Sequence, residues 1–250
     1  MRTKIIAGNW KMNKTVADTA ELINGLKAKL SAAPKAGVIV CPPYTSLALA
    51  VELVKGSPIK VGAQDVSVND DGAFTGEVSI GMLKAVGCDY VIVGHSERRQ
   101  YFKESDELIN RKAKKVFAAG LTPIICVGET LEERESGITS QVVTNQIKGV
   151  TAGLTAEQME RTIIAYEPVW AIGTGKTATS AQAEEVHLLI RSLLTGLFSD
   201  AVAQKVVIQY GGSVKPDNAK ELLAQPNIDG ALVGGACLKA DSFAAIVDAA

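Results

Sequence analysis

The chain has 250 residues, of which 47% are hydrophobic and 21% charged, a composition that argues against disorder and favours a folded protein with a large core. Its 26 Lys and Arg against 27 Asp and Glu give a net charge of −1, so the overall charge indicates no nucleic-acid or anionic-membrane partner. No apolar run reaches the ~18 residues of a membrane span, and MRTKIIAGNW reads directly into a strand, so we expect neither membrane insertion nor a signal peptide.

Eight β-rich runs recur along the chain, separated by segments with helical spacing of apolar residues, such as 16–30 and 186–197. Most runs are continuous Val, Ile, Leu and Ala stretches, which is typical of parallel strands covered on both faces. The runs are residues 4–10, 37–42, 59–63, 89–94, 122–128, 162–166, 205–210 and 228–234.

Helix starts are indicated where Thr130 precedes Glu133 and where Thr155 precedes Gln158, because both pairs have the spacing of a capping box. No linker or low-complexity tract divides the chain. Eight βα units therefore predict an α/β protein with one (β/α)8 barrel domain, a TIM barrel, over residues 1–250. A doubly wound open sheet remains the alternative, because periodicity does not show closure, and the length also permits two small domains.

The four cysteines Cys41, Cys88, Cys126 and Cys237 are far apart and form no C-x-x-C pair. A chain of this size does not need disulfides for stability. We therefore expect reduced, mostly buried thiols and a cytoplasmic location.

Polar residues gather where the predicted strands end: Asn9 and Lys11 at the first, His95 at the fourth and Glu167 at the sixth. In a closed barrel these ends share one rim, where active sites of such barrels lie. A carboxylate can remove a proton beside a carbonyl if placed donors stabilise the enolate oxygen. This pattern makes Glu167 the candidate base, with Lys11 and His95 as donors.

Glycines close the last two strands, in 210-YGGS-213 and in 234-GG-235, and a helical pattern at 216–223 follows the first of these turns. Exposed backbone amides near a helix N-terminus bind phosphate well. The sequence therefore indicates a phosphorylated carbonyl compound of modest size as substrate.

Residues 165–179, AYEPVWAIGTGKTAT, have the composition of a lid over 168–178. Pro168 would stiffen one hinge, the exposed-looking Trp170 would anchor the segment, and the glycines of 173–176 would give it mobility. A lid of this kind would exclude water from a reactive intermediate.

Six segments, in order and covering the chain nearly end to end, resemble the triosephosphate isomerase family. They are GNWKMN (8–13), VGHSERR (93–99), CVGETLEERESG (126–137), AYEPVWAIGTG (165–175), YGGSVKP (210–216) and ALVGGA (231–236). The resemblance implies interconversion of dihydroxyacetone phosphate and glyceraldehyde 3-phosphate without a cofactor or metal.

The resemblance also implies residue roles. Glu167 would shuttle the proton, and His95 would polarise the carbonyl as a neutral imidazole. Lys11 would stabilise charge with Asn9 beside it, and Glu97 would be a supporting acid near Lys11.

The phosphate, by the same resemblance, would be held by backbone amides of Gly173, Ser213, Gly234 and Gly235, with 171–175 as the tip of the lid. The sequence departs from the family at two places. Cys237 stands where many members have Ser or Ala, and Lys103 stands where glycine is common. Neither change touches a predicted catalytic residue.

Residues 65–79 resemble the family's protruding third loop. In the family this loop inserts into a second subunit, so the resemblance implies a homodimer with Thr75 near the partner's site.

Each candidate has a plainer interpretation when taken alone. Glu167 could start a helix, Lys11 could be solvated, Trp170 could be core, and His187 in a helical pattern is expected to be structural. The tract 173-GTGKT-177 is not a nucleotide-binding P-loop, because that motif requires glycine where this chain has Trp170. Two other functions remain open: a Schiff-base aldolase using Lys11, and a sugar-phosphate sensor without catalysis.

Overall fold

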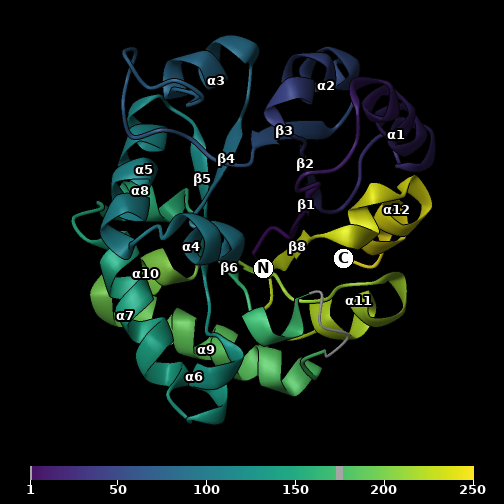
Figure 1. Ribbon diagram of the computed structural model, residues 1–250. Helices are drawn as coiled ribbons and strands as arrows, with labels where there is room; N and C mark the ends of the chain where they lie inside the picture. The colour runs from purple at the N-terminus through teal and green to yellow at the C-terminus, as the bar shows by residue number, and fades with distance from the viewer. Residues whose placement is uncertain (1, 173–176) are drawn as a thin grey trace.

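In the computed structural model, which describes residues 2–172 and 177–250, eight parallel strands pair in chain order and the last pairs with the first (Figure 1). Closure is direct: Ile5 of the first strand lies in register with Gly230 of the last. The barrel prediction is therefore confirmed, and the open sheet is excluded. The strands are β1 (Ile5–Asn9), β2 (Gly37–Cys41), β3 (Ile59–Ala63), β4 (Tyr90–Val93), β5 (Thr122–Val127), β6 (Ile163–Tyr166), β7 (Val207–Tyr210) and β8 (Gly230–Val233).

Helices surround the barrel on its outer face (Figure 1). All eight predicted runs form strands, with ends displaced by at most two residues. The helices are α1 (Val16–Lys29), α2 (Leu47–Val54), α3 (Ile80–Val86), α4 (Ser96–Phe102), α5 (Asp106–Ala118), α6 (Leu131–Glu135), α7 (Thr139–Thr151), α8 (Ala156–Glu160), α9 (Ser180–Leu197), α10 (Asp200–Ala203), α11 (Pro216–Leu223) and α12 (Ala240–Asp248), with 3-10 turns η1 (Tyr44–Ser46), η2 (Val169–Ala171) and η3 (Gly235–Leu238).

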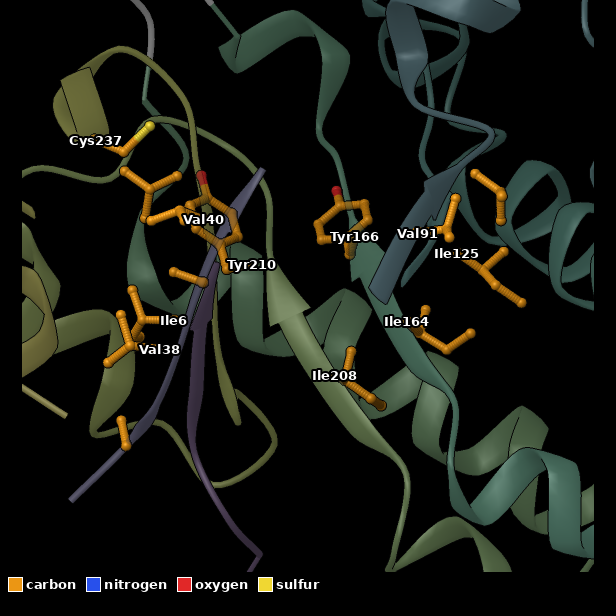
Figure 2. Close-up of a cluster of buried hydrophobic side chains, with 14 of the residues drawn as sticks. Ile6, Val38, Val40, Val91, Ile125, Ile164, Tyr166, Ile208, Tyr210 and Cys237 are labelled. Atoms are coloured by element: carbon orange, nitrogen blue, oxygen red, sulfur yellow. The ribbon is translucent and has the colours of Figure 1, made fainter. Parts of the chain in front are cut away.

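The buried apolar side chains form two clusters that separate along each strand. On β1, Ile6 packs in a cluster that includes helix residues such as Ile23, whereas Ala7 belongs to a cluster built from strand residues alone. Successive side chains point to opposite faces of a strand, so the first cluster lies between strands and helices and the second fills the barrel. Figure 2 shows part of the first cluster. The continuous apolar runs in the sequence reflect this double coverage.

Local signals in the sequence are also confirmed. Thr130 with Glu133 opens α6, and Thr155 with Gln158 opens α8, each as a reciprocal capping box. Lys103 ends α4 in the left-handed conformation with φ of +57°. That backbone geometry favours glycine, which gives a physical reason for the glycine common in the family at this position.

All four cysteines are buried and unpaired. In the described ranges, no helix combines the length and apolar character that a bilayer crossing requires.

Candidate active site

A cavity of about 720 Å³ lies where β1, β4, β6, β7 and β8 end. Seven of the predicted site residues line it: Asn9, Lys11, His95, Glu167, Ser213, Gly234 and Gly235. Glu97 is held nearby by an ion pair with Lys11, at 2.8 Å. Gly173 and the remaining predicted lid-tip residues up to 175 lie outside the described residues.

Glu167 follows β6 directly, and only 2% of its surface is exposed. Its carboxylate lies 2.9 Å from Nε2 of His95 and accepts a hydrogen bond from the Ser96 amide at 2.9 Å and one from the Ser96 hydroxyl at 3.2 Å. Burial opposes the charged form, but the contacts with His95 and Ser96, with Lys11 nearby, outweigh it and lower the pKa of Glu167. The carboxylate is therefore charged at neutral pH although it is buried.

His95 is the residue before α4, and its position in the fold assigns its tautomer. The backbone amide of Glu97 donates to Nδ1 of His95 at 3.2 Å, so Nδ1 acts as an acceptor. In a neutral imidazole the proton then resides on Nε2, which points at Glu167. The ring therefore presents an N–H donor to the interior of the cavity.

Lys11 follows β1 with a left-handed backbone, at φ of +52°. Asn9 accepts from the Lys11 amide at 3.0 Å, and Gln64 donates to the Lys11 carbonyl at 2.8 Å. The side chain is fixed by the carboxylate of Glu97. These contacts direct an ammonium group into the cavity from the β1 side.

The glycines after β7 and β8 allow close approach to the cavity. A Cβ atom on Gly211 would lie 2.8 Å from Cγ of Glu167, whereas a Cβ on Gly235 would meet no protein atom within 4 Å. Ser213 precedes α11, whose first residue is Pro216. The two glycine turns therefore expose backbone beside open space, where a small anionic group would fit.

Comparison with known proteins agrees with this geometry. A family model described as triosephosphate isomerase matches residues 4–250. The chain belongs to the triosephosphate isomerase family. Proteins named triosephosphate isomerase from Clostridium botulinum (strain ATCC 19397 / Type A) and Carboxydothermus hydrogenoformans are 56% and 58% identical to it, over 99% of this chain and 100% and 98% of theirs. One from Roseiflexus sp. (strain RS-1) is 54% identical over 99% of this chain and 97% of its own. The chain is thus an isomerase.

Trp170 of this triosephosphate isomerase family member differs from the expectation. It looked exposed in the sequence, but it is only 9% exposed and lies in η2. Its indole N–H donates to Glu129 at 2.9 Å, and the Arg134 guanidinium covers its ring at 4.8 Å from the centroid. Glu129 and Arg134, both in the segment after β5, thus supply a hydrogen-bond acceptor and a cation for the indole. These two contacts explain why Trp170 is buried although it lies beside a glycine-rich stretch.

Glu129 and Ser96 are site residues that sequence reasoning missed. Glu129 is fully buried and also accepts from the hydroxyl of Tyr166 at 3.1 Å, and Ser96 binds the carboxylate of Glu167. Both lie in segments that resemble the family, and both follow predicted strands. The available signal was therefore a polar residue at a strand end, the same signal that identified His95.

Cys237, one of the two departures from the family pattern, is fully buried within η3, the turn after β8, and packs against Gly8. Burial raises the pKa of its thiol to about 12. The thiol therefore stays protonated at neutral pH and is a packing group of the hydrophobic core.

Among residues 2–172 and 177–250, no group of three or more His, Cys, Asp or Glu side chains is arranged to hold a metal ion. Function without metal or cofactor stays a prediction from the family resemblance.

Proposed function

We propose that the protein interconverts dihydroxyacetone phosphate and D-glyceraldehyde 3-phosphate by proton transfer through an enediolate. The observation that carries this proposal is the meeting of a buried carboxylate, an imidazole N–H and an ammonium group at one cavity. These are Glu167, His95 and Lys11, remote in sequence and together on its wall. The names of the relatives support the choice of substrate.

Glu167 is the base in this mechanism. Its carboxylate takes a proton from the carbon beside the carbonyl, the C–H electron pair forms the C=C bond of the enediolate, and the proton returns to the neighbouring carbon. In the structure the carboxylate is bound to Ser96 and His95. We expect it to turn from these partners toward the substrate, since catalytic contacts tighten only in the complex.

His95 and Lys11 stabilise the oxygen on which charge develops. The Nε2–H of His95 donates to that oxygen, and the Lys11 ammonium, held by Glu97 and steadied through Asn9, adds a positive charge. Loss of one such donor typically costs about 3 kcal/mol of barrier lowering.

The substrate phosphate is assigned to the turns after β7 and β8. Ser213, Gly234 and Gly235 line the same cavity as the base, so one small substrate can span both regions. Gly173, predicted as a fourth donor, and the predicted lid over 168–178 stay predictions from the resemblance. The described flank supports the lid, because Trp170 is anchored to Glu129 beside the cavity.

A homodimer through loop 65–79 is part of the proposal. Residues 70–77 of this loop are exposed, and its base is tied to α5 and α4 by the ion pairs of Asp65 with Lys112 and Arg98. Large apolar side chains are exposed on this loop, on the segment after β1 and on α3 and α4. They are Met12, Phe74, Met82, Tyr101 and Phe102. A second copy of the chain would cover this apolar surface.

An assay tests the reaction: glyceraldehyde 3-phosphate, without added cofactor or metal, should yield dihydroxyacetone phosphate in a coupled assay. The variant Glu167→Gln should lose turnover by several orders of magnitude while still binding a phosphate-bearing inhibitor. Unchanged turnover in this variant would contradict the assignment of the base.

The two alternative functions, a Schiff-base aldolase and a non-catalytic sensor, give different experimental results from an isomerase. A Schiff base needs a free amine at Lys11, whereas the ammonium forms an ion pair with Glu97, so borohydride trapping with substrate should give no adduct on Lys11. A sensor would bind the phosphate without turnover, and it would leave the buried carboxylate of Glu167 without a role.

A further inference from the structure

His187 of α9 is a fully buried imidazole that the proposed mechanism does not use. Its ring lies 5.8 Å from the ring of Tyr166, with the two planes at 85°, and 6.3 Å from the ring of Tyr210, with the planes at 40°. Tyr166 and Tyr210 are the last residues of β6 and β7 and pair in register (Figure 2). One imidazole therefore contacts the aromatic side chains that end two neighbouring strands.

The two tyrosines are joined directly to the site. Tyr166 precedes Glu167, and its carbonyl accepts from the Gly211 amide at 2.7 Å. Tyr210 precedes Gly211, and its hydroxyl lies so close to Gly212 that a Cβ there would be 2.2 Å away. Both rings therefore belong to residues that adjoin Glu167 and the glycine turn after β7.

A hydrogen bond from the His187 ring to the backbone orients the imidazole. Nδ1 lies 3.2 Å from the carbonyl oxygen of Asn227, and because a carbonyl accepts, Nδ1 carries the proton. Asn227 is held in turn by Glu184, which accepts from its amide nitrogen at 3.0 Å and from its side chain at 2.6 Å. The imidazole plane is thereby locked, which a purely apolar side chain could not achieve.

The environment keeps this ring neutral. Burial, opposed by the Asn227 carbonyl and assisted by the charge of Arg191, lowers the pKa of His187 to about 3. Nε2 has no hydrogen-bond partner among the described residues. A buried imidazole with one unsatisfied nitrogen is costly to retain for packing alone, since an aliphatic side chain would fill the space without that nitrogen.

We propose that His187 is a positioning residue of the isomerase, whose locked ring sets Tyr166 and Tyr210 and through them Glu167 and the 211–213 turn. This inference rests on the proposed function. It assigns no contact between His187 and substrate. The contact of His187 with Tyr166 positions the base and should affect kcat. The contact of His187 with Tyr210 positions the 211–213 turn, where we place the substrate phosphate, and should affect KM.

Two substitutions separate the ring from the hydrogen bond. His187→Phe keeps a ring without the donor, and His187→Asn keeps a donor near the Nδ1 position without the ring. We expect His187→Asn to lower kcat tenfold or more and to raise KM, because the ring contacts are lost, and His187→Phe to lower kcat about three- to tenfold, because the ring remains without the hydrogen bond that orients it. Leu194→Ala, two turns along the same face of α9, is the matched control and should lower thermal stability with kcat unchanged.

A double-mutant cycle distinguishes positioning from general packing. Tyr166→Leu removes the ring that His187 contacts, so His187→Asn should lose less activity in that background than in the wild type. Equal losses in both backgrounds would overturn the proposal, as would equal kcat for the wild type and His187→Asn, or equal losses for the Phe and Asn variants.

Two controls address an unstable variant and an inactive wild-type protein. If His187→Asn is too unstable to assay, His187→Gln, which fills more of the ring volume, takes its place in the same comparisons and under the same criteria. Isomerase activity of the wild type is measured in the same preparation. An inactive wild type would contradict the proposed function, whereas an active wild type with unaffected variants would contradict only the role of His187.

Discussion

Gly211 lies against the side chain of Glu167 so closely that a Cβ at position 211 would be 2.8 Å from Cγ of the carboxylate side chain. Contacts this short are not found for real Cβ atoms, and Tyr166 O would be 3.1 Å away on the same side. The glycine after β7 therefore has a second role beside the phosphate turn: it leaves room for the base.

The variant Gly211→Ala should consequently displace Glu167 and lower kcat by about 10- to 100-fold, since small misplacements of a reacting group are costly. Gly235→Ala is the matched control, because its Cβ would meet no protein atom within 4 Å and would enter only the proposed phosphate space. It should raise KM more than it lowers kcat. Steady-state kinetics of both variants check this, and a wild-type kcat for Gly211→Ala would contradict it.

Glu129 should hold the segment after β6 in place. Its carboxylate accepts from Trp170, Tyr166 and Arg134, and the side chain is fully buried. Glu129→Gln leaves the Arg134 charge without its partner and should reduce the free energy of unfolding by about 1–3 kcal/mol and shift the tryptophan emission. The exposed Glu132→Gln on α6 should change neither, and identical behaviour of the two variants would refute the anchoring role.

Lys103 carries a conformational cost that glycine would remove. A non-glycine residue in the left-handed region costs about 1–2 kcal/mol. Glycine would remove this strain, but the larger conformational entropy that glycine gives the unfolded chain would offset part of the gain. Lys103→Gly should therefore raise the free energy of unfolding by up to about 1 kcal/mol. Lys55→Gly, also at a helix end but with φ of −51°, should lower it. Denaturant unfolding measures both, and effects of the same sign would argue against the strain.

The stability of the fold should depend on pH through His187. Its pKa is lowered from 6.5 to about 3, so between these values the unfolded chain binds a proton that the folded protein excludes. The stabilising contribution is complete above pH 6.5 and is lost as pH falls toward 3, at about 1.4 kcal/mol per pH unit. His187→Phe should lack this part of the pH dependence. Denaturant unfolding of both proteins at pH 7.5 and 5.5 measures this pH dependence. An equal change in the free energy of unfolding for the wild type and His187→Phe would exclude the contribution of His187.

The proposed dimer gives a fifth prediction. Thr75 is exposed at the loop after β3, so Thr75→Arg should introduce a bulky charge into the interface and shift sedimentation toward the monomer. Ala201→Arg, exposed on α10 before the distant strand β7, is the control and should sediment like the wild type. An unchanged profile for Thr75→Arg would count against the loop as the interface.

The sequence alone determined the elements and the kind of chemistry. Apolar runs located the strands to within two residues, and the Thr130 and Thr155 capping boxes located helix starts, because side-chain periodicity and capping act within a few residues. Residue types at strand ends, with the family resemblance, selected Lys11, His95 and Glu167 as candidates.

Only the tertiary structure decided closure and environment. The pairing of Ile5 with Gly230, the Ser96 contact with Glu167 and the burial of Trp170 against Glu129 each join segments that are far apart in the chain. Hydropathy reports a residue's own tendency to be buried, whereas hydrogen-bond partners, exposure and the balance of charge depend on which remote segments share the same space.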